Sequence, residues 1–349
     1  MRTRFHLLLM LLVSCLSVTH AVAQSMSQPF LLTSETDLST DYKQKVLPFF
    51  ADRVVQGTFS GVNNNEIAYA YVIHPDEIGS IVISSGRIES LIKYKELLFD
   101  LYQNGYSVFI WDHRGQGLSG RMLPQKQRGY VENFDNFVAD MQQFYQTIVK
   151  PNSPHKPKLL CHSMGGAIGA LYLLKHPDDF SSVVFSSPMF GIKSPIPDWA
   201  ALPIINAGLG LNATFSNKAW YFIGQTDYIA VPFAMNTITH SKLRYQIFRD
   251  EYEQKPQAKL GGVTLRWLKS AFIAMEHIAN SADKIELPVL VMQSGGDMVV
   301  ENKAQDEVCN KLPNCSVQKI DGAKHELLME QDQYRTPALN HVLTFFAAN

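Results

Sequence analysis

Continuous apolar runs alternate along the chain with stretches of helical periodicity. The apolar runs lie at 79–84, 107–111, 158–161, 180–186 and 287–293. The helical stretches lie at 91–102, 134–149 and 165–175. A strand that is buried on both faces is expected to be apolar throughout. The alternation therefore predicts a mostly parallel central sheet with helices on both faces.

Further elements are expected at both ends of this pattern. Residues 54–62 and 67–74 read as two strands joined at Asn63-Asn64-Asn65, which is a hairpin turn signal. Residues 316–320 read as a closing strand and 331–346 as a final helix. The polar stretch 24–41 is expected to be coil.

The alternation stops between residues 193 and 280. This stretch contains Pro and Gly breaks, helical patches, and many aromatic and methionine residues. Because the closing strands come after it, we predict an inserted, largely helical cap and not a sequential second domain. The predicted division is a core formed by 24–192 and 281–349, with a cap at 193–280.

The first 23 residues differ from the rest of the chain. Arg2 and Arg4 precede an apolar run from Leu7 to Val18, and Ala21-Val22-Ala23 follows. This is the pattern of a cleaved signal peptide, here residues 1–23, and it predicts an exported protein, with the periplasm as the favoured location. An uncleaved membrane anchor and lipidation at Cys15 are the alternatives.

Net charge bears on the partners of the protein, and cysteine content bears on its disulfides. With 31 Lys and Arg against 32 Asp and Glu, the net charge of −1 gives no indication of a nucleic-acid surface. Leader cleavage would leave three cysteines. Cys309 and Cys315 flank a turn signal and could form a disulfide, with two free thiols as the alternative; Cys161 is expected to be a buried, inert thiol.

The strongest chemical signal is the segment Lys158-Leu-Leu-Cys-His-Ser-Met-Gly-Gly-Ala167. An apolar strand, a serine and a helix that opens with glycines are typical of a nucleophile elbow, in which the serine is exposed at a sharp turn. We predict Ser163 as the nucleophile. The usual pattern is G-x-S-x-G, and Cys161 replaces its first glycine.

An activated serine needs a base and an orienting acid, which in this fold follow it in the order acid, histidine. Asp297 follows the strand at 287–293, and His325 follows the strand at 316–320. We therefore predict a triad of Ser163, Asp297 and His325, with Asp321 as the rival acid. The expected oxyanion donors are the main-chain N–H groups of Met164 and Arg87.

At this point the chain resembles the bacterial lysophospholipase L2 family, a branch of the α/β-hydrolases close to monoacylglycerol lipases. The resemblance covers nearly the whole mature chain, including Gly261-Gly262 and Trp267 in the cap. Its main motifs are Ser85-Gly-Arg-Ile-Glu-Ser90, Asp112-His-Arg-Gly-Gln-Gly117, His162-Ser-Met-Gly-Gly-Ala167, Pro188-Met-Phe-Gly-Ile192 and Gly322-Ala-Lys-His-Glu326. Ser85, where broader relatives carry histidine, and the exported leader depart from the family pattern.

The resemblance implies a serine esterase that hydrolyses lysophospholipids or other single-chain lipid esters. It implies an acyl-enzyme intermediate, a capped acyl tunnel, no metal and no cofactor, and it is consistent with transacylase activity. A monoacylglycerol lipase or general carboxylesterase is the alternative. A non-catalytic lipid-binding protein of this fold would be expected to lack a triad member.

Four further residues are predicted to contact the substrate. Gly86 and His162 lie beside the predicted oxyanion donor and nucleophile. Lys242 and Arg249 are seven residues apart, so they would share a face if their segment is helical and could bind a phosphate headgroup. Arg244 would then point to the opposite side. A membrane surface is a further expected partner, and the sequence predicts no oligomeric state.

Overall fold

The computed structural model describes residues 30–194, 196 and 198–349. The predicted leader, 1–23, lies outside this range. The eight strands form one sheet in the order β1-β2-β4-β3-β5-β6-β7-β8. Their bounds are β1 Val55–Ser60, β2 Glu66–Val72, β3 Gly79–Ser84, β4 Tyr106–Trp111, β5 Lys158–His162, β6 Val183–Ser186, β7 Val289–Ser294 and β8 Cys315–Ile320.

The sheet is mostly parallel, as predicted. β1 and β2 form an antiparallel hairpin, β2 runs antiparallel to β4, and all other neighbouring strands run parallel. At the hairpin turn, Asn63 and Asn64 both adopt a φ of 57°, a left-handed conformation that asparagine tolerates better than most residues. Every residue of β3, β4, β6 and β7 is buried, which explains why these strands are mostly apolar.

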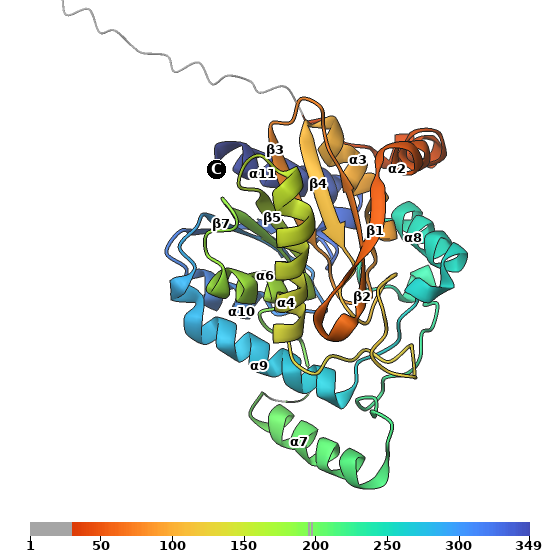
Figure 1. Ribbon diagram of the computed structural model, residues 1–349, viewed down its shortest axis with the longest axis vertical. Coiled ribbons are helices and arrows are strands. Elements are labelled where there is room, and N and C mark those ends of the chain that lie inside the picture. The colour runs from red at the N-terminus through yellow and green to blue at the C-terminus, as the bar shows by residue number, and fades with distance from the viewer. Residues whose placement is uncertain (1–29, 195, 197) are drawn as a thin grey trace, which may run out of the picture.

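Helices cover both faces of the sheet (Figure 1). One hydrophobic cluster contains buried side chains of α4, α6, α9 and α10, and the other contains those of α2, α3, α8 and α11. The helix bounds are α1 Glu35–Asp41, α2 Leu47–Arg53, α3 Lys95–Gln103, α4 Asp135–Phe144, α5 Lys150–Asn152, α6 Met164–Lys175, α7 Asp198–Phe215, α8 Lys242–Gln254, α9 Leu265–Ser281, α10 Asn302–Cys309 and α11 Asp332–Ala348. The predicted fold class is confirmed.

The stretch 193–280 is largely helical, but its helices are not equivalent. α8 packs into the core through Tyr245, Phe248 and Tyr252, and α9 packs against α6. Only α7 lies outside both helical layers, where it packs against α9 (Figure 1). Its Trp199 and Phe215 side chains are 82% and 73% exposed.

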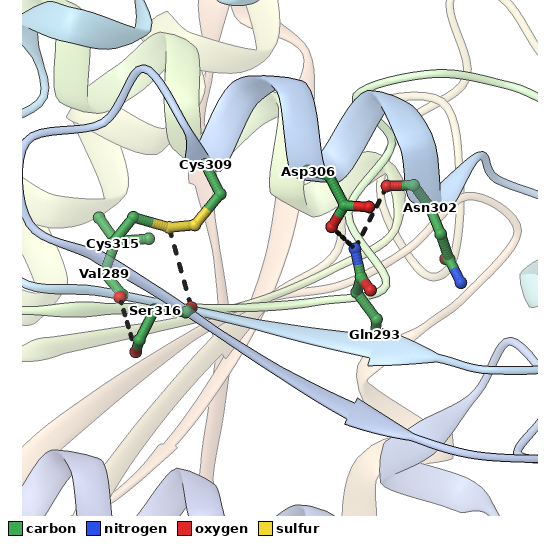
Figure 2. The surroundings of a disulfide bond; sticks show 7 residues. All are labelled: Val289, Gln293, Asn302, Asp306, Cys309, Cys315 and Ser316. Atoms are coloured by element: carbon green, nitrogen blue, oxygen red, sulfur yellow. Dashed lines mark hydrogen bonds between the residues drawn. A yellow bond between two sulfur atoms is a disulfide. The ribbon is translucent and has the colours of Figure 1, made fainter.

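The structure corrects the prediction of coil near the start of the chain and decides between the two alternatives for Cys309 and Cys315. Of the segment 24–41 expected to be coil, residues 24–29 lie outside the described range, and Glu35–Asp41 forms the helix α1, because the Ser34 side chain accepts a hydrogen bond from the Asp37 N–H and caps it. Cys309 and Cys315 form a disulfide with a Cα–Cα distance of 5.6 Å, which joins the end of α10 to the start of β8 (Figure 2).

None of the helices in the described part of the chain combines the length and the apolar character that a membrane span requires.

Candidate active site

Ser163 occupies a strained turn between β5 and α6. Its φ is 52° and its ψ is −118°, a conformation that L residues other than glycine rarely adopt and that the surrounding hydrogen bonds hold in place. The Ser163 N–H donates to the Ser186 carbonyl at 3.1 Å, and its own carbonyl accepts from the Gly166 N–H at 2.8 Å. A Cβ on Gly165 would overlap the Ser84 carbonyl, so this close approach requires glycine.

The structure brings Ser163, His325 and Asp297 together in a chain of contacts. His325 Nε2 lies 2.9 Å from Ser163 Oγ, and His325 Nδ1 lies 2.8 Å from Asp297 Oδ2. The loops after β7 and β8 supply the acid and the histidine, because the carboxyl ends of parallel strands meet at one edge of the sheet. All three side chains are buried.

The surroundings of Asp297 keep it ionised. Burial alone would raise the pKa of Asp297, but the hydrogen bond and charge of His325 and the N–H groups of Val299 and Val300 lower it below its ordinary value. The rival acid, Asp321, instead pairs with Lys319 at 2.8 Å, and its side chain is 84% exposed. The geometry therefore supports Asp297 as the partner of His325.

The two predicted oxyanion donors border the same cavity as Ser163. Gly86, Arg87 and Met164 line it together with His325. Neither the Arg87 N–H nor the Met164 N–H finds an acceptor among the described residues. For Met164 this follows from its position as the first residue of α6, where the N–H has no partner within the helix. Both groups are thus available to a developing negative charge.

A buried polar network that the sequence analysis missed supports this region. The Glu89 carboxylate accepts hydrogen bonds from the Gly86 N–H, from Tyr94 Oη at 2.6 Å and from Lys93 Nζ at 2.7 Å. Lys93 also pairs with Glu326, the residue after His325. The spacing of Glu89 and Lys93, four residues apart, was the only local signal.

His162 connects this network to His325. Its Nδ1 lies 3.2 Å from Glu89 Oε2, and its Nε2 lies 3.3 Å from the His325 carbonyl oxygen. Burial lowers the pKa of His162, but the Glu89 charge and hydrogen bond raise it by more, so the net shift is upward. Burial likewise raises the pKa of Glu89, yet Lys93 and His162 hold it well below its usual range. His162 lines the cavity and is held in place by these two contacts.

The cavity has a volume of about 410 Å³, and apolar side chains form much of its wall. Met189 and Ile192 come from the segment after β6, Met298 and Val299 from the loop that bears Asp297, and Trp267 from α9. Such a wall suits an acyl chain, because each buried methylene contributes about 0.8 kcal/mol.

The structure corrects the expectation for Lys242 and Arg249, since neither lines this cavity. Arg249 instead donates to Tyr228 Oη at 2.7 Å and to Tyr245 Oη at 2.6 Å. Lys242 is an exposed residue at the start of α8. Arg244 does point away from them, into a buried pair with Glu96. The segment is helical as assumed, but its shared face does not reach the site.

Cys161 lies in β5, two residues before Ser163, and is a free, buried cysteine. Burial raises the pKa of its thiol well above the ordinary value, so it stays protonated. Its Sγ occupies the space that a Cβ on Gly169 of α6 would need. The larger residue at this elbow position is therefore accommodated by a glycine one helix turn inside α6.

Comparison with known proteins gives a consistent family. The family described as serine aminopeptidase, S33 (Hydrolase_4) matches residues 75–332. Lysophospholipase L2 of Escherichia coli (strain K12) is 35% identical over 300 residues, covering 83% of this chain and 87% of that protein. The probable lysophospholipase L2 of Haemophilus influenzae is 33% identical, covering 86% and 94%. Monoglyceride lipase of Rattus norvegicus is 26% identical, covering 76% and 81%.

Solved structures agree on the fold. The chain superposes on a crystal structure of Paleococcus ferrophilus monoacylglycerol lipase with a TM-score of 0.62 and 18% identity, covering 82% of this chain and 99% of that one. A soluble variant of Saccharomyces cerevisiae monoglyceride lipase in complex with a substrate analogue gives a TM-score of 0.62 and 17% identity, covering 85% and 96%. At these identities the likeness establishes an α/β-hydrolase fold and nothing finer.

Proposed function

The chain belongs to the serine aminopeptidase S33 family of hydrolases, in its lysophospholipase L2 branch, and from this membership we propose that it hydrolyses the acyl ester of lysophospholipids. One observation carries the proposal. Ser163, His325 and Asp297 form a continuous hydrogen-bonded chain at the wall of a largely apolar cavity. An ester with one long acyl chain fits this combination of a nucleophile and an apolar wall.

In the proposed mechanism, Ser163 Oγ attacks the ester carbonyl carbon while His325 Nε2 accepts the hydroxyl proton. Asp297 holds the proton on Nδ1, so Nε2 is free to act as the base. The main-chain N–H groups of Arg87 and Met164 stabilise the oxyanion. The ester C–O bond then breaks, and the departing glycerophosphodiester alcohol takes the proton from His325.

Deacylation repeats these steps with water. A water molecule attacks the acyl-enzyme carbonyl and gives one proton to His325, which returns it to Ser163 Oγ as the free fatty acid leaves. If the hydroxyl group of another lipid attacks in place of water, the acyl group moves to that lipid. The same site would then act as a transacylase.

The test compares wild type with Ser163→Ala on single-chain lipids. Wild type should react with a fluorophosphonate probe at Ser163 and release fatty acid from lysophosphatidylcholine. Ser163→Ala should lose both reactions while its unfolding curve stays close to that of wild type, because the change removes one oxygen atom. Labelling at another serine, together with retained ester turnover in Ser163→Ala, would refute the assignment.

A monoacylglycerol lipase is the second candidate, since monoglyceride lipases share 26% identity with the chain over three quarters of its length. The two functions differ in headgroup preference. The panel should therefore pair each lysophospholipid with the monoacylglycerol of the same acyl chain, and a higher kcat/KM on the monoacylglycerol would favour the lipase.

We further propose that the protein is exported, with the periplasm as its location. The leader at 1–23 supports this, and so does the Cys309–Cys315 disulfide, because disulfides persist in oxidising compartments. Fractionating cells and sequencing the N-terminus of the purified protein tests the proposal. A protein that retains residues 1–23 in the cytoplasmic fraction would contradict it.

A further inference from the structure

Arg87 presents a cation to the active-site cavity that no protein carboxylate neutralises. The residue lines the cavity, and its guanidinium carbon lies 5.8 Å from the ring centroid of Trp267, which lines it as well. In the part of the chain that the structure describes, no carboxylate lies within ion-pair distance of Arg87. Burial lowers the pKa of Arg87 to about 10, so the group still carries its charge at neutral pH.

The fully buried cations among the described residues have acidic partners. The pairs are Lys93 with Glu89 and Glu326, Lys95 with Glu251, Arg114 with Asp140, Arg244 with Glu96, and Arg335 with Asp100. Withdrawing a charge from water without a partner is unfavourable. Arg87 is partly buried and has no such partner, so its charge is available to an anionic ligand in the cavity.

One end of the guanidinium is fixed by the segment Gly261-Gly262. Arg87 Nη1 donates to the Gly261 carbonyl at 3.0 Å. Three backbone hydrogen bonds of 2.8 Å hold this segment, from the Gly261 N–H to the Gln127 carbonyl, from the Gly262 N–H to the Thr226 carbonyl, and from the Gly129 N–H to the Gly262 carbonyl. A Cβ on Gly261 would lie 2.5 Å from the Thr226 carbonyl oxygen, so this approach also requires glycine.

The other donors of Arg87 have no acceptor among residues 30–194, 196 and 198–349. A guanidinium carries five N–H donors in a planar fork that matches two phosphate or carboxylate oxygens. One bond to Gly261 orients the fork and leaves Nε and Nη2 available. The two carboxylates at the cavity, Glu89 and Glu326, already share Lys93, so they do not compete for Arg87.

We propose that the Arg87 guanidinium binds the phosphodiester anion of a lysophospholipid headgroup. This inference rests on the proposed function and names the residue that distinguishes a lysophospholipid from a neutral monoacylglycerol. The Arg87 side chain has a suitable length to reach the phosphate while its main-chain N–H faces the oxyanion. The phosphorus of a 1-acyl lysophospholipid lies about six covalent bonds from the ester carbonyl carbon, and the guanidinium carbon lies about six bonds from the Arg87 amide nitrogen that would face the oxyanion.

The test measures kcat/KM of wild type, Arg87→Met and Arg87→Lys on 1-palmitoyl-lysophosphatidylcholine and on 1-palmitoylglycerol. Each substitution keeps the main-chain N–H, so the readout is the ratio of the two kcat/KM values. Arg87→Met should lower this ratio by about 10- to 100-fold, mainly through KM on the lysophospholipid, because it removes charge-assisted hydrogen bonds to the substrate. Arg87→Lys should restore part of the ratio, since it keeps the charge but not the fork.

Arg128→Met is the matched control. The Arg128 guanidinium also donates to a main-chain carbonyl, that of Ala219, and lies 5.0 Å from the ring centroid of Tyr221, but it does not line the cavity. Its substitution should leave the substrate ratio unchanged. An equal fall of the ratio in Arg128→Met and Arg87→Met would overturn the proposal, because the effect would then not depend on an arginine that lines the cavity.

The substrate preference of wild type and of Arg87→Met tests the arginine site and the proposed function separately. If wild type prefers lysophosphatidylcholine and Arg87→Met keeps that preference, the arginine site is wrong and the proposed function stands. If wild type prefers 1-palmitoylglycerol, the proposed function itself fails.

Inhibition distinguishes a headgroup from free phosphate as the source of the anion. Competitive inhibition of wild type by sn-glycero-3-phosphocholine that is stronger than that by inorganic phosphate, and that Arg87→Met abolishes, supports a headgroup site. Inhibition by inorganic phosphate that is as strong as that by sn-glycero-3-phosphocholine overturns the headgroup assignment. Equal inhibition of wild type and Arg87→Met by either compound also counts against the site.

Discussion

Replacing Asp297 by asparagine should leave the fold intact and remove most of the activity. Asp297 Oδ1 accepts hydrogen bonds from the N–H groups of Val299 at 2.7 Å and Val300 at 3.0 Å, while Oδ2 faces His325 Nδ1. An asparagine that keeps its carbonyl oxygen toward the two amides turns its NH₂ group toward His325. Nδ1 must then accept a hydrogen bond, the ring proton moves to Nε2, and Nε2 can no longer accept the proton of Ser163.

The size of the effect follows from this change of tautomer. In a serine protease triad, the same substitution lowers kcat by about 10⁴-fold, which is about 5 kcal/mol of activation free energy. Because the pKa of Asp297 is lowered in the folded state, ionised Asp297 stabilises the protein above its unfolded pKa. That contribution is lost only as the pH falls through the lowered value. Near neutral pH this stabilisation is present in wild type and is given up in Asp297→Asn, so kcat must be compared at equal folded fraction.

The assay compares Asp297→Asn with Asp321→Asn, which removes the same charge from a nearby loop. Asp321 is exposed and pairs only with Lys319 among the described residues, so its substitution should change the free energy of unfolding by about 0.5 kcal/mol or less and leave kcat near that of wild type. Fatty acid release from lysophosphatidylcholine gives kcat, and urea unfolding gives the folded fraction. A larger loss in Asp321→Asn at equal folded fraction would refute the reasoning and transfer the role.

Three further predictions concern the residues around the site. Gly169→Ala should lower the free energy of unfolding by about 1–3 kcal/mol through overlap with Cys161 Sγ, and adding Cys161→Gly should recover much of this in a urea double-mutant cycle. Glu89→Gln should lower the pKa of His162, which an NMR titration measures. In wild type, the pairing of Glu89 with His162 stabilises the fold below the unfolded histidine pKa of about 6.5, and this contribution is lost as the pH rises through the raised folded pKa. Cys315→Ser should cost about 2 kcal/mol in urea unfolding, and an unchanged midpoint would show that the disulfide does not stabilise the fold.

The strand and helix pattern could be predicted well because it depends on local burial. β3, β4 and β7 are buried on both faces, so each reads as an apolar run whatever lies next to it. The order of nucleophile, acid and histidine follows from the fold, since parallel strands place their following loops at one edge of the sheet. α1 was missed because its signal is a single capping serine, Ser34, in front of a polar segment.

The polar network around the site could not be predicted in the same way. Lys93 bridges Glu89 to Glu326, which lies 233 residues further along the chain, and His162 contacts the backbone of His325 across 163 residues. A buried charge pair leaves no periodicity in the sequence, because its partner is selected by the packing of separate elements. The seven-residue spacing of Lys242 and Arg249 predicted that they share a helix face. It did not predict that this face lies away from the cavity.

The sequence by itself predicted the sheet, the turn at Ser163 between a strand and a helix, and the three side chains that meet there. Tertiary packing decided that α8 and α9 join the core layers and α7 lies outside, because this depends on which apolar faces find partners. It also decided which cations are neutralised. Arg244 pairs with Glu96, whereas Arg87 contacts a carbonyl, an aromatic ring and the cavity beside Ser163, with no carboxylate partner among the described residues.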